Sequence, residues 1–373
     1  MRVRLLAVAA AALVFATPAH AGAPAVSARA FFVVNPATGE VLVQHRAWAR
    51  VPIASITKLM TVLVVLDHAD WNDVVRVRSD AADVGESTVN LRAGERITVG
   101  DLVRAALIQS ANDAADALAY YVGNGSETRF VSMMNARAKS LGLRDTHYAR
   151  PDGLDAPGHV SSARDVTKLA RLLMRRPIVR SIVRRQTATI AGGRVLHTWN
   201  DLLATFPGVF GVKTGHTSAA GWNEVASVDR RGAVVYATIL GSPDRSTRNT
   251  DLTALLRWGL SRFQRVPVIR SDRVYARVEV GYGRAKVDLV PQARLVRAIR
   301  VDRPLVERVV ASAVAPLPVH KGQWLGWVRV YQAGRLLGRE PLVASRTVTK
   351  PGVFGRVAFY AAGTGRHIWG WVP

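Results

Sequence analysis

The chain contains no cysteine, and this absence excludes three kinds of chemistry. It rules out disulfides, zinc sites with thiolate ligands and a cysteine nucleophile. The 9 histidines form no His-Glu-x-x-His pattern, which argues against a zinc peptidase of that type. A chain of 373 residues can build a core that is stable without disulfides, so the composition remains compatible with an exported protein.

Lysine is scarce, although the chain is strongly basic. Of the 51 basic residues, 44 are arginine, and the lysines are residues 58, 139, 168, 213, 286, 321 and 350. Arginine does not deprotonate in proteins and cannot act as a general base, whereas a buried lysine can. A lysine inside a short motif is therefore more informative in this chain than in most.

The first 21 residues are predicted to be a secretory signal. Met1-Arg2-Val3-Arg4 is a short basic start, the apolar stretch 5–16 follows, and Ala19-His20-Ala21 fits the small-residue rule for cleavage. A membrane-spanning anchor is the alternative, but the apolar stretch is short for that, and no later one reaches spanning length. We expect an exported protein, periplasmic or at the outer face of the cytoplasmic membrane.

The formal net charge of +24 restricts the partners. A strongly basic protein can bind nucleic acid, but an exported protein rarely meets nucleic acid, so we expect no nucleic-acid partner. Anionic lipid head groups and anionic wall polymers fit better. The alternative is that the arginine content reflects genome composition and solubility.

Three motifs that each occur once carry the chemistry: Ser55-Ile56-Thr57-Lys58, Ser110-Ala111-Asn112 and Lys213-Thr214-Gly215. A lone Ser-x-x-Lys usually means only that two side chains share a helix face. Here two of the few lysines lie in motifs. Together the motifs supply a nucleophile, a base, a relay hydroxyl, an amide and a cationic strand edge, as in an acyl-transfer site.

The residue pattern predicts two domains of different texture. Hydrophobic residues make up 49% of the chain and charged residues 21%, which is typical of globular proteins. In the first part we expect a hairpin over 31–43, helices over 55–66, 101–108, 113–121 and 250–263, and strands over 210–214, 222–228 and 233–240. From about Arg265, alternating segments such as 274–280 and 324–331 predict an all-β domain.

These motifs resemble those of the D-alanyl-D-alanine carboxypeptidases, which are low-molecular-mass penicillin-binding proteins of the serine type. Matching stretches are 52–61, 110–114, Gly153-Leu154-Asp155, 161–165, 211–217, Lys321-Gly322-Gln323 and 352–357. The resemblance implies an α+β fold, a penicillin-binding/β-lactamase-like antiparallel sheet flanked by helices, followed by a small all-β domain. It implies a catalytic domain over 22–265 and a β-sandwich over 266–350.

The roles of the motif residues follow from chemistry together with this resemblance. Ser55 is the expected nucleophile and Lys58 its base, provided that burial and Lys213 lower the pKa of Lys58. Ser110 would relay a proton, and Asn112 would bond Lys58 and the substrate amide. The expected substrate-binding residues are Lys213, Thr214, Gly215, His216 and Arg248. No metal or cofactor is needed.

Two of these assignments have alternatives. The resemblance implies an oxyanion hole formed by the backbone N–H groups of Ser55 and His216. His216 as a catalytic base is the alternative, which the Ser–Lys pair makes unnecessary. Arg248 is expected just before the closing helix, where it would assist carboxylate binding. The alternative for Arg248 is an exposed arginine without a role.

The expected activity is removal of the terminal D-alanine of peptidoglycan stem pentapeptides, with β-lactams as inhibitors. A β-lactamase or DD-endopeptidase on the same scaffold is an alternative, and so is a catalytically silent wall-binding protein. Ala111, in place of the Asp of a Ser-Asp-Asn motif, and the absence of Glu-x-x-Leu-Asn near 150–165 argue against a β-lactamase. Pro151-Asp152 departs slightly from the residues usual in the family.

The last residues, 351–373, are predicted to form a peripheral membrane anchor. Aromatic residues alternate there with Arg356, Arg366 and His367, which suits the head-group boundary of an anionic membrane. A last strand packed on the β domain is the alternative. The preference at the third stem-peptide residue, the oligomeric state and the envelope type stay open.

Overall fold

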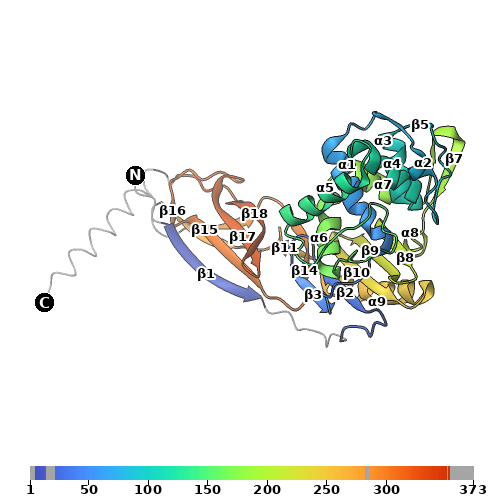
Figure 1. Cartoon of the computed structure of the whole chain (residues 1–373). Helices are drawn as coiled ribbons and strands as arrows, with labels where there is room; N and C mark the ends of the chain where they lie inside the picture. The colour runs from blue at the N-terminus through green and yellow to red at the C-terminus, as the bar shows by residue number, and fades with distance from the viewer. Residues whose placement is uncertain (1–4, 14–21, 282–284, 351, 353–373) are drawn as a thin grey trace. The chain divides into compact units, whose positions relative to one another are not determined.

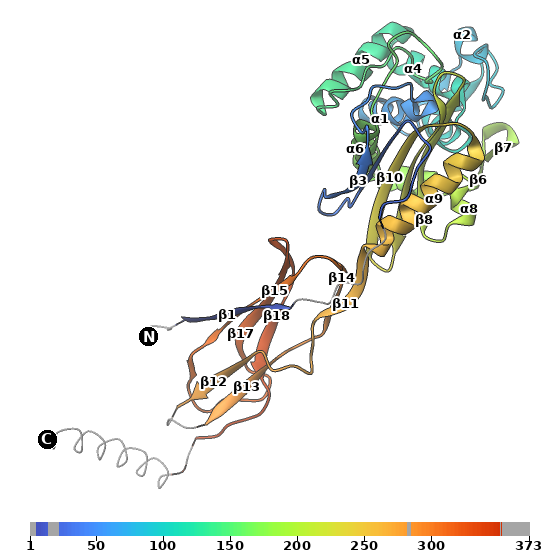
Figure 2. The same cartoon turned by 90° about the horizontal axis from the view of Figure 1, so that it is seen from below.

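The computed structural model describes residues 5–13, 22–281, 285–350 and 352. The chain divides into two compact units, each with its own hydrophobic core (Figures 1 and 2). The larger unit ends at Ser261, and the smaller unit contains the chain from Arg262 together with strand β1 (Leu5–Leu13). All three chemical motifs lie in the larger unit.

The larger unit is built on a five-stranded antiparallel sheet with the order β3-β2-β10-β9-β8. Its strands are β2 (Ala30–Val34), β3 (Val41–His45), β8 (Val209–Thr217), β9 (Gly221–Arg230) and β10 (Ala233–Ser242). The predicted hairpin and the three predicted strands are therefore confirmed. Strand β8, which carries Lys213-Thr214-Gly215, lies at an edge of the sheet.

Helices cover both faces of this sheet. Thr167 of α6 (Ala163–Leu173) forms a 2.6 Å hydrogen bond with Thr238 of β10. Gly259 of α9 (Arg245–Ser261) packs against Val235 of the same strand. Positions 235 and 238 point to opposite faces because side chains alternate along a strand. The antiparallel sheet flanked by helices, an α+β fold, is confirmed.

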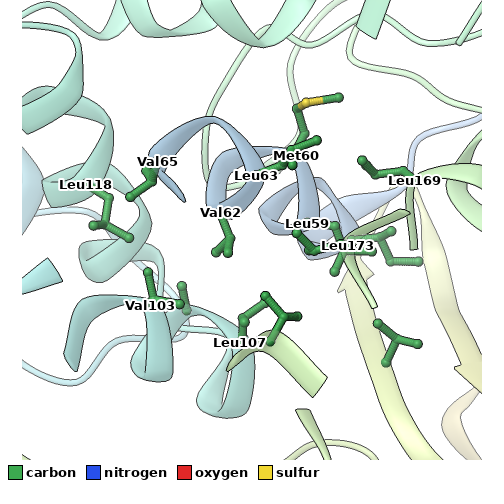
Figure 3. Packing of buried hydrophobic residues seen from close by; sticks show 14 of the residues in the cluster. Leu59, Met60, Val62, Leu63, Val65, Val103, Leu107, Leu118, Leu169 and Leu173 are labelled. Carbon is green, nitrogen blue, oxygen red and sulfur yellow. The ribbon is translucent and has the colours of Figure 1, made fainter. Parts of the chain in front are cut away.

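The helix after Ser55 forms the centre of the core. Eight of the 11 residues of α1 (Lys58–His68) are buried, as expected for a helix that is apolar on most of its surface. Figure 3 shows Leu59, Val62 and Val65 among side chains of the neighbouring helices. These are α3 (Val99–Arg104), α4 (Asn112–Val122) and α6. The tight packing holds the first turn of α1 in a fixed position.

The remaining elements surround this core. The helices are α2 (Ser79–Ala82), α5 (Glu127–Ser140), α7 (Pro177–Val183) and α8 (Leu202–Thr205). Two pairs of antiparallel strands complete the unit: β4 (Val74–Arg76) with β5 (Arg96–Thr98), and β6 (Thr187–Ile190) with β7 (Arg194–His197).

Helix α9 begins at Arg245, earlier than the predicted start at residue 250. Asp244 caps its first turn, because its carboxylate accepts hydrogen bonds from Thr247 N at 2.8 Å and Thr247 Oγ1 at 2.6 Å. An aspartate before a helix supplies acceptors for otherwise unpaired N–H groups. Arg248 therefore lies inside the helix, and its predicted place before the helix is wrong.

The smaller unit is all-β in its described residues. A seven-stranded sheet has the order β1-β15-β17-β18-β13-β12-β16, and a two-stranded sheet pairs β11 with β14. The strands are β11 (Phe263–Ile269), β12 (Ala276–Val280), β13 (Lys286–Pro291), β14 (Leu295–Arg300), β15 (Leu305–Ser312), β16 (Val314–Ala315), β17 (Trp324–Gln332) and β18 (Arg335–Ala344). The small C-terminal β domain is confirmed.

The two ends of the chain carry predictions that stay open. Strand β1 lies within the predicted signal and pairs antiparallel with β15. Removal of residues 1–21 would leave β15 as the edge of its sheet. Among the described residues, no helix is both long and apolar enough to cross a membrane. The predicted anchor at 351–373 lies outside the described residues, apart from Gly352.

Candidate active site

Ser55 and Lys58 lie at the junction of a 3-10 turn and the central helix. Residues Ala54–Thr57 form the turn η1, and Lys58 is the first residue of α1. Side chains at i and i+3 eclipse in a 3-10 helix, so these two point the same way. Lys58 is fully buried, and its Nζ donates a 2.8 Å hydrogen bond to Ser55 Oγ. The predicted shared face is confirmed.

The other hydrogen bonds of Lys58 determine what its amine can do. Nζ donates to Asn112 Oδ1 at 2.7 Å and to the backbone carbonyl of Asp152 at 2.6 Å. Both oxygens can only accept, so each holds one N–H of the amine. A neutral amine has two N–H groups and one lone pair. In the charged form the third N–H donates to Ser55 Oγ. In the neutral form, with both N–H groups held by carbonyl oxygens, the lone pair faces that hydroxyl.

Burial prepares Lys58 for this role. Desolvation lowers the pKa of Lys58 from 10.5 to about 8, although Asp152 and Asp116 oppose the shift. A pKa of about 8 leaves roughly a tenth of the amine neutral at pH 7, far more than an exposed lysine would have, and the neutral form is the one that a general base requires. The predicted lowering of the pKa of Lys58 by burial agrees with this result. Lys213 is not among the causes resolved for Lys58.

Ser110 connects the second and third motifs. Its backbone is left-handed, with φ 68° and ψ 27°, and it ends a π-helical turn over Ala105–Gln109. A non-glycine residue in this conformation is strained, and such strain is concentrated at functional sites. Lys213 Nζ donates to Ser110 Oγ at 2.7 Å and to the carbonyl of Thr214 at 2.8 Å. The strained turn thus places the Ser110 hydroxyl against Lys213.

Lys213 is 2% exposed, and its environment favours a neutral amine. Burial lowers the pKa of Lys213 well below 10.5, the Lys58 charge lowers it further, and Glu224 opposes the shift. Negative charge from a substrate carboxylate would favour the charged form. Lys213 is therefore expected to become a cation when a carboxylate binds beside it.

Gly215 allows strand β8 to lie against the backbone of the nucleophile. A Cβ at this position would lie 3.0 Å from Ser55 N and 2.8 Å from the carbonyl oxygen of Ile53. A side chain would therefore push the strand away from the turn η1. This approach brings the backbone of Ser55 and His216 to one place, as the predicted oxyanion hole requires.

A cleft of about 180 Å³ connects the predicted residues. It is lined by Ser55, Glu86, Ser87, Ser110, Asn112, Trp199, Thr214, Gly215, His216, Trp222 and Arg248. Lys58 and Lys213 are buried against it through their bonds to Ser55 and Ser110. All nine residues predicted from the sequence therefore gather at a single site.

Arg248 is 1% exposed, so its interpretation as an exposed arginine is wrong. Its Nε lies 3.2 Å from Glu224 Oε2, and its Nη2 lies 3.2 Å from Asp201 Oδ2 and donates to Asn249 Oδ1 at 2.6 Å. These contacts fix the guanidinium against the cleft wall. Burial raises the pKa of Glu224 to about 7, although Arg248 opposes the shift.

His216 is exposed on β8, where its ring lies 4.1 Å from the ring of Trp222. The described contacts of Ser55 and Lys58 do not include its imidazole. A catalytic base needs hydrogen-bond reach to the proton that it removes. The geometry therefore favours a lining role for His216 and the amine of Lys58 as the base.

Sequence reasoning missed a buried charged network behind Lys58. Arg150 donates two hydrogen bonds to the Asp152 carboxylate, at 3.1 and 2.7 Å. Burial would raise the pKa of Asp152, but Arg150 and Lys58 outweigh it and hold this pKa below its usual value. Asp116 lies one helical turn after Asn112 on α4, and burial together with Asp152 and Glu127 raises its pKa to about 8. The Pro151-Asp152 departure was the signal for part of this network.

The cleft also holds side chains that the motifs did not identify. Glu86, Trp199 and Trp222 line it, and Asn112 is held there by its Nδ2 bond to the carbonyl of Gly85 at 2.9 Å. The spacing of these residues gives no signal in the sequence. Among the described residues, no group of three or more His, Asp or Glu side chains could hold a metal ion.

The fold and this site define a serine hydrolase of the Ser–Lys type: an α+β unit with a lysine amine on the nucleophile and an open strand edge beside it. The family model of the D-alanyl-D-alanine carboxypeptidases, peptidase family S11, matches residues 17–244. The chain belongs to this family and is a serine peptidase.

Relatives and solved structures agree. The chain is 33% identical over 365 residues to the D-alanyl-D-alanine carboxypeptidase DacC of Escherichia coli K12, covering 92% of this chain and 90% of that protein. It is 30% identical to DacF of Bacillus subtilis 168, with 87% of each chain covered. The Haemophilus influenzae penicillin-binding protein 5 structure has a TM-score of 0.64 at 26% identity and covers 88% of this chain and 100% of that one.

The catalytic unit has a further match of its own. A Streptomyces K15 DD-transpeptidase structure has a TM-score of 0.61 at 31% identity and covers 64% of this chain and 99% of that one. The family and these neighbours support peptidoglycan as the substrate class and binding of β-lactams.

Proposed function

We propose that the protein removes the terminal D-alanine from peptidoglycan stem pentapeptides through an acyl-enzyme on Ser55. The observation that carries this proposal is the environment of the Lys58 amine. Its two N–H groups are held by Asn112 Oδ1 and the Asp152 carbonyl, at 2.7 and 2.6 Å, and its third contact is Ser55 Oγ at 2.8 Å. An amine held in this way is oriented to take the hydroxyl proton.

In the acylation step, Lys58 accepts the Ser55 proton while Oγ attacks the carbonyl carbon between the two terminal D-alanines. The negative charge on the carbonyl oxygen would be stabilised by the backbone N–H groups of Ser55 and His216. When the C–N bond breaks, the leaving amine takes the Ser110 hydroxyl proton, and the proton that Lys58 took from Ser55 passes to Ser110, so that Lys58 is neutral again. Water then attacks the ester with Lys58 as base, releasing the shortened peptide and restoring Ser55.

The terminal carboxylate of the substrate would lie beside Lys213 and Thr214, with Arg248 fixed behind them. Lys213 and Arg248 are nearly fully buried, so a carboxylate in the cleft meets positive charge that water screens weakly. The open edge of β8 offers backbone groups for an extended peptide to pair with. Both contacts favour a peptide that ends in a free carboxylate.

Fluorescent penicillin and a pentapeptide test this function together. We expect penicillin to label the protein, mass spectrometry to find the adduct on Ser55, and the pentapeptide to lose one D-alanine. Ser55→Ala should stop both reactions without unfolding the chain. Penicillin turnover faster than D-alanine release would indicate a β-lactamase, and cleavage of cross-links alone an endopeptidase. No labelling at saturating penicillin would indicate the silent wall-binding protein.

The proposed location is outside the cytoplasmic membrane, with residues 1–21 removed and the tail attached peripherally. The basic start, the apolar stretch and the small-residue site support export. The aromatic and basic residues of 353–372 support attachment to anionic lipid. Vesicle co-sedimentation of the mature chain against a chain ending at Lys350 tests the anchor. Equal binding by both chains refutes it, and an intact N-terminus in the exported protein refutes cleavage.

A further inference from the structure

The outer face of the seven-stranded sheet carries three arginines in one row. Arg308 of β15 lies opposite Arg329 of β17, which lies opposite Arg339 of β18. Val328 and Val330, the neighbours of Arg329 in β17, are fully buried. Because side chains alternate along a strand, the arginines lie on the solvent side. Adjacent strands lie about 4.8 Å apart, so the row extends roughly 10 Å across the sheet.

This row lacks compensating negative charge. The ion pairs of the described part of this unit engage other arginines, among them Arg273, Arg277 and Arg300. Within the same residues, no carboxylate pairs with any of the three guanidinium groups of the row. Like charges directly opposite each other destabilise a sheet. An anionic partner would remove this cost.

Two of the three guanidinium groups are fixed in orientation by aromatic rings. The guanidinium carbon of Arg308 lies 5.0 Å from the ring centre of Tyr331, and that of Arg339 lies 4.9 Å from the ring centre of Trp327. A stacked guanidinium keeps its N–H edge free for bidentate bonds to an oxyanion. The row is therefore ordered before any partner binds.

An exposed aromatic ring lies next to the row. Trp324 is 57% exposed, and its ring lies 6.0 Å from that of Trp327. In the register, Val310 and Pro341 flank Trp327 on the adjacent strands. The exposed apolar surface of Trp324 and Trp327 therefore lies next to the row of positive charge. Sugar rings pack their C–H faces on aromatic rings, whose faces carry partial negative charge.

We propose that Arg308, Arg329, Arg339 and Trp324 form a docking surface for an anionic polysaccharide, the peptidoglycan strand itself. Carboxylates along the polymer pair with the arginines, and a sugar ring stacks on Trp324. A second contact on the same polymer raises the effective concentration of stem peptides at the catalytic cleft. The choice of peptidoglycan as the polymer rests on the proposed function, whereas the surface itself does not.

A lipid membrane fits this surface less well. Insertion at the head-group boundary needs a group of apolar side chains that leave water together. Here the rings of Trp327 and Tyr331 are half-buried and lie under guanidinium groups. Trp324 is the one strongly exposed ring in this described patch. A row of stacked arginines on adjacent strands matches a polyanion that lies across the strands.

Binding to insoluble, purified peptidoglycan tests the proposal, with the Ser55→Ala chain as parent so that turnover does not interfere. The variant carries Arg308→Gln, Arg329→Gln and Arg339→Gln. We expect its Kd to rise about tenfold or more, with the loss of three charge-assisted contacts. The matched control carries Arg265→Gln, Arg277→Gln and Arg294→Gln, exposed residues of the same unit. It removes the same charge and should change Kd by less than about twofold.

Two further variants separate geometry from charge. Replacing the row by three lysines keeps the net charge but loses bidentate pairing, so we expect an intermediate rise in Kd. Trp324→Ala should weaken binding at high salt, where ion pairs are screened. Thermal unfolding checks that each variant is folded, and single substitutions replace any triple variant that is not.

The outcomes are distinct. Equal losses in both triple glutamine variants would assign binding to diffuse charge and overturn the proposal. If the arginine-row variant still binds peptidoglycan but no longer attaches to phosphatidylglycerol vesicles, the surface is assigned to the membrane and the proposal is overturned too.

Penicillin labelling is measured on chains with Ser55 intact. If labelling persists while the row variants bind peptidoglycan normally, the docking surface fails and the proposed function stands. If labelling fails in the otherwise unchanged chain, the proposed function fails.

Discussion

Gly153 lies directly against Ala54, the residue before the nucleophile. A Cβ at position 153 would lie 2.2 Å from the carbonyl oxygen of Ala54 and 2.9 Å from Thr57 Cβ, and the φ of Gly153 is +89°. The loop that supplies the Asp152 carbonyl to Lys58 can therefore pack on the turn η1 because residue 153 has no side chain. Position 153 couples this loop to Ser55.

We predict that Gly153→Ala impairs catalysis more than it impairs folding. The added methyl group must displace the loop or the turn η1, which shifts Lys58 relative to Ser55. A displacement of about 1 Å near the reacting groups can cost on the order of 10²-fold in rate. Stopped-flow acylation by penicillin measures the rate, and chemical unfolding measures the stability. Gly158→Ala is a control, since its φ is +75° and a Cβ would meet only His147 Nδ1 at 3.8 Å. Similar acylation rates in both variants would disprove the coupling.

The acylation rate should rise with pH until the Lys58 amine is neutral. Burial lowers the pKa of Lys58 to about 8, so the fraction of neutral amine increases up to that pH and levels off above it.

Lys58→Arg should lose on the order of 10²-fold or more in acylation, because arginine does not act as a base. Lys213→Arg still offers a cation to the substrate carboxylate and should retain more activity. The pH profile of penicillin acylation in all three chains is the measurement, and a flat profile below pH 8 would exclude Lys58 as the base.

Short motifs in the sequence pick out residues that the fold brings together at one cleft. Ser55-x-x-Lys58 and Lys213-Thr214-Gly215 each contain one of the few lysines at a fixed spacing from its partners, so local geometry brings the groups of each motif together. The predicted strands and the central helix agree because hydrophobic period decides both. The predicted start of α9 at residue 250 was too late. A capping aspartate such as Asp244 gives a weaker signal in the sequence than hydrophobic periodicity does, and the periodicity set that prediction.

The charged network could not be predicted, because its members come from separate segments. Asp116 follows Asn112 on α4, whereas Arg150 and Asp152 lie on a loop and are joined by hydrogen bonds. Only the fold brings Asp116 near this pair. Glu224 meets the cleft through the strand register, in which it lies opposite Thr214. Pairings of this kind depend on tertiary packing, which leaves no periodic trace in the sequence.

Asp116→Asn should stabilise the protein increasingly as the pH rises from about 4 to about 8. Burial raises the pKa of Asp116 from 3.8 to about 8, so the folded state keeps a proton that the unfolded state loses in this range. The unfolding free energy of the wild type therefore falls with pH because of this group. Asparagine is neutral at every pH and removes the dependence. Chemical unfolding at several pH values measures the difference, with Asp80→Asn, at an exposed aspartate, as the control. A constant difference between variant and wild type would contradict the raised pKa.

Arg248→Gln should destabilise the larger unit and weaken binding of substrates that end in a carboxylate. The substitution leaves Glu224, which is 0% exposed, without the cation that lies 3.2 Å from it. Arg248 opposes the raised pKa of Glu224, which is about 7, so its removal should raise that pKa further. Breaking a buried ion pair costs about 3 kcal/mol, and the loss relative to the wild type should grow as the pH rises through about 7, where Glu224 ionises in the folded wild type but not in the variant.

The double variant Arg248→Gln/Glu224→Gln isolates the binding role of Arg248. It removes the orphaned carboxylate as well, so it should recover part of the lost stability. If Arg248 also assists the substrate carboxylate, both variants should show a raised KM for a pentapeptide with a free carboxylate and a smaller change for its C-terminal amide. Chemical unfolding and steady-state kinetics of the two variants separate these effects. Recovery of KM together with stability in the double variant would mean that Arg248 acts only by balancing Glu224.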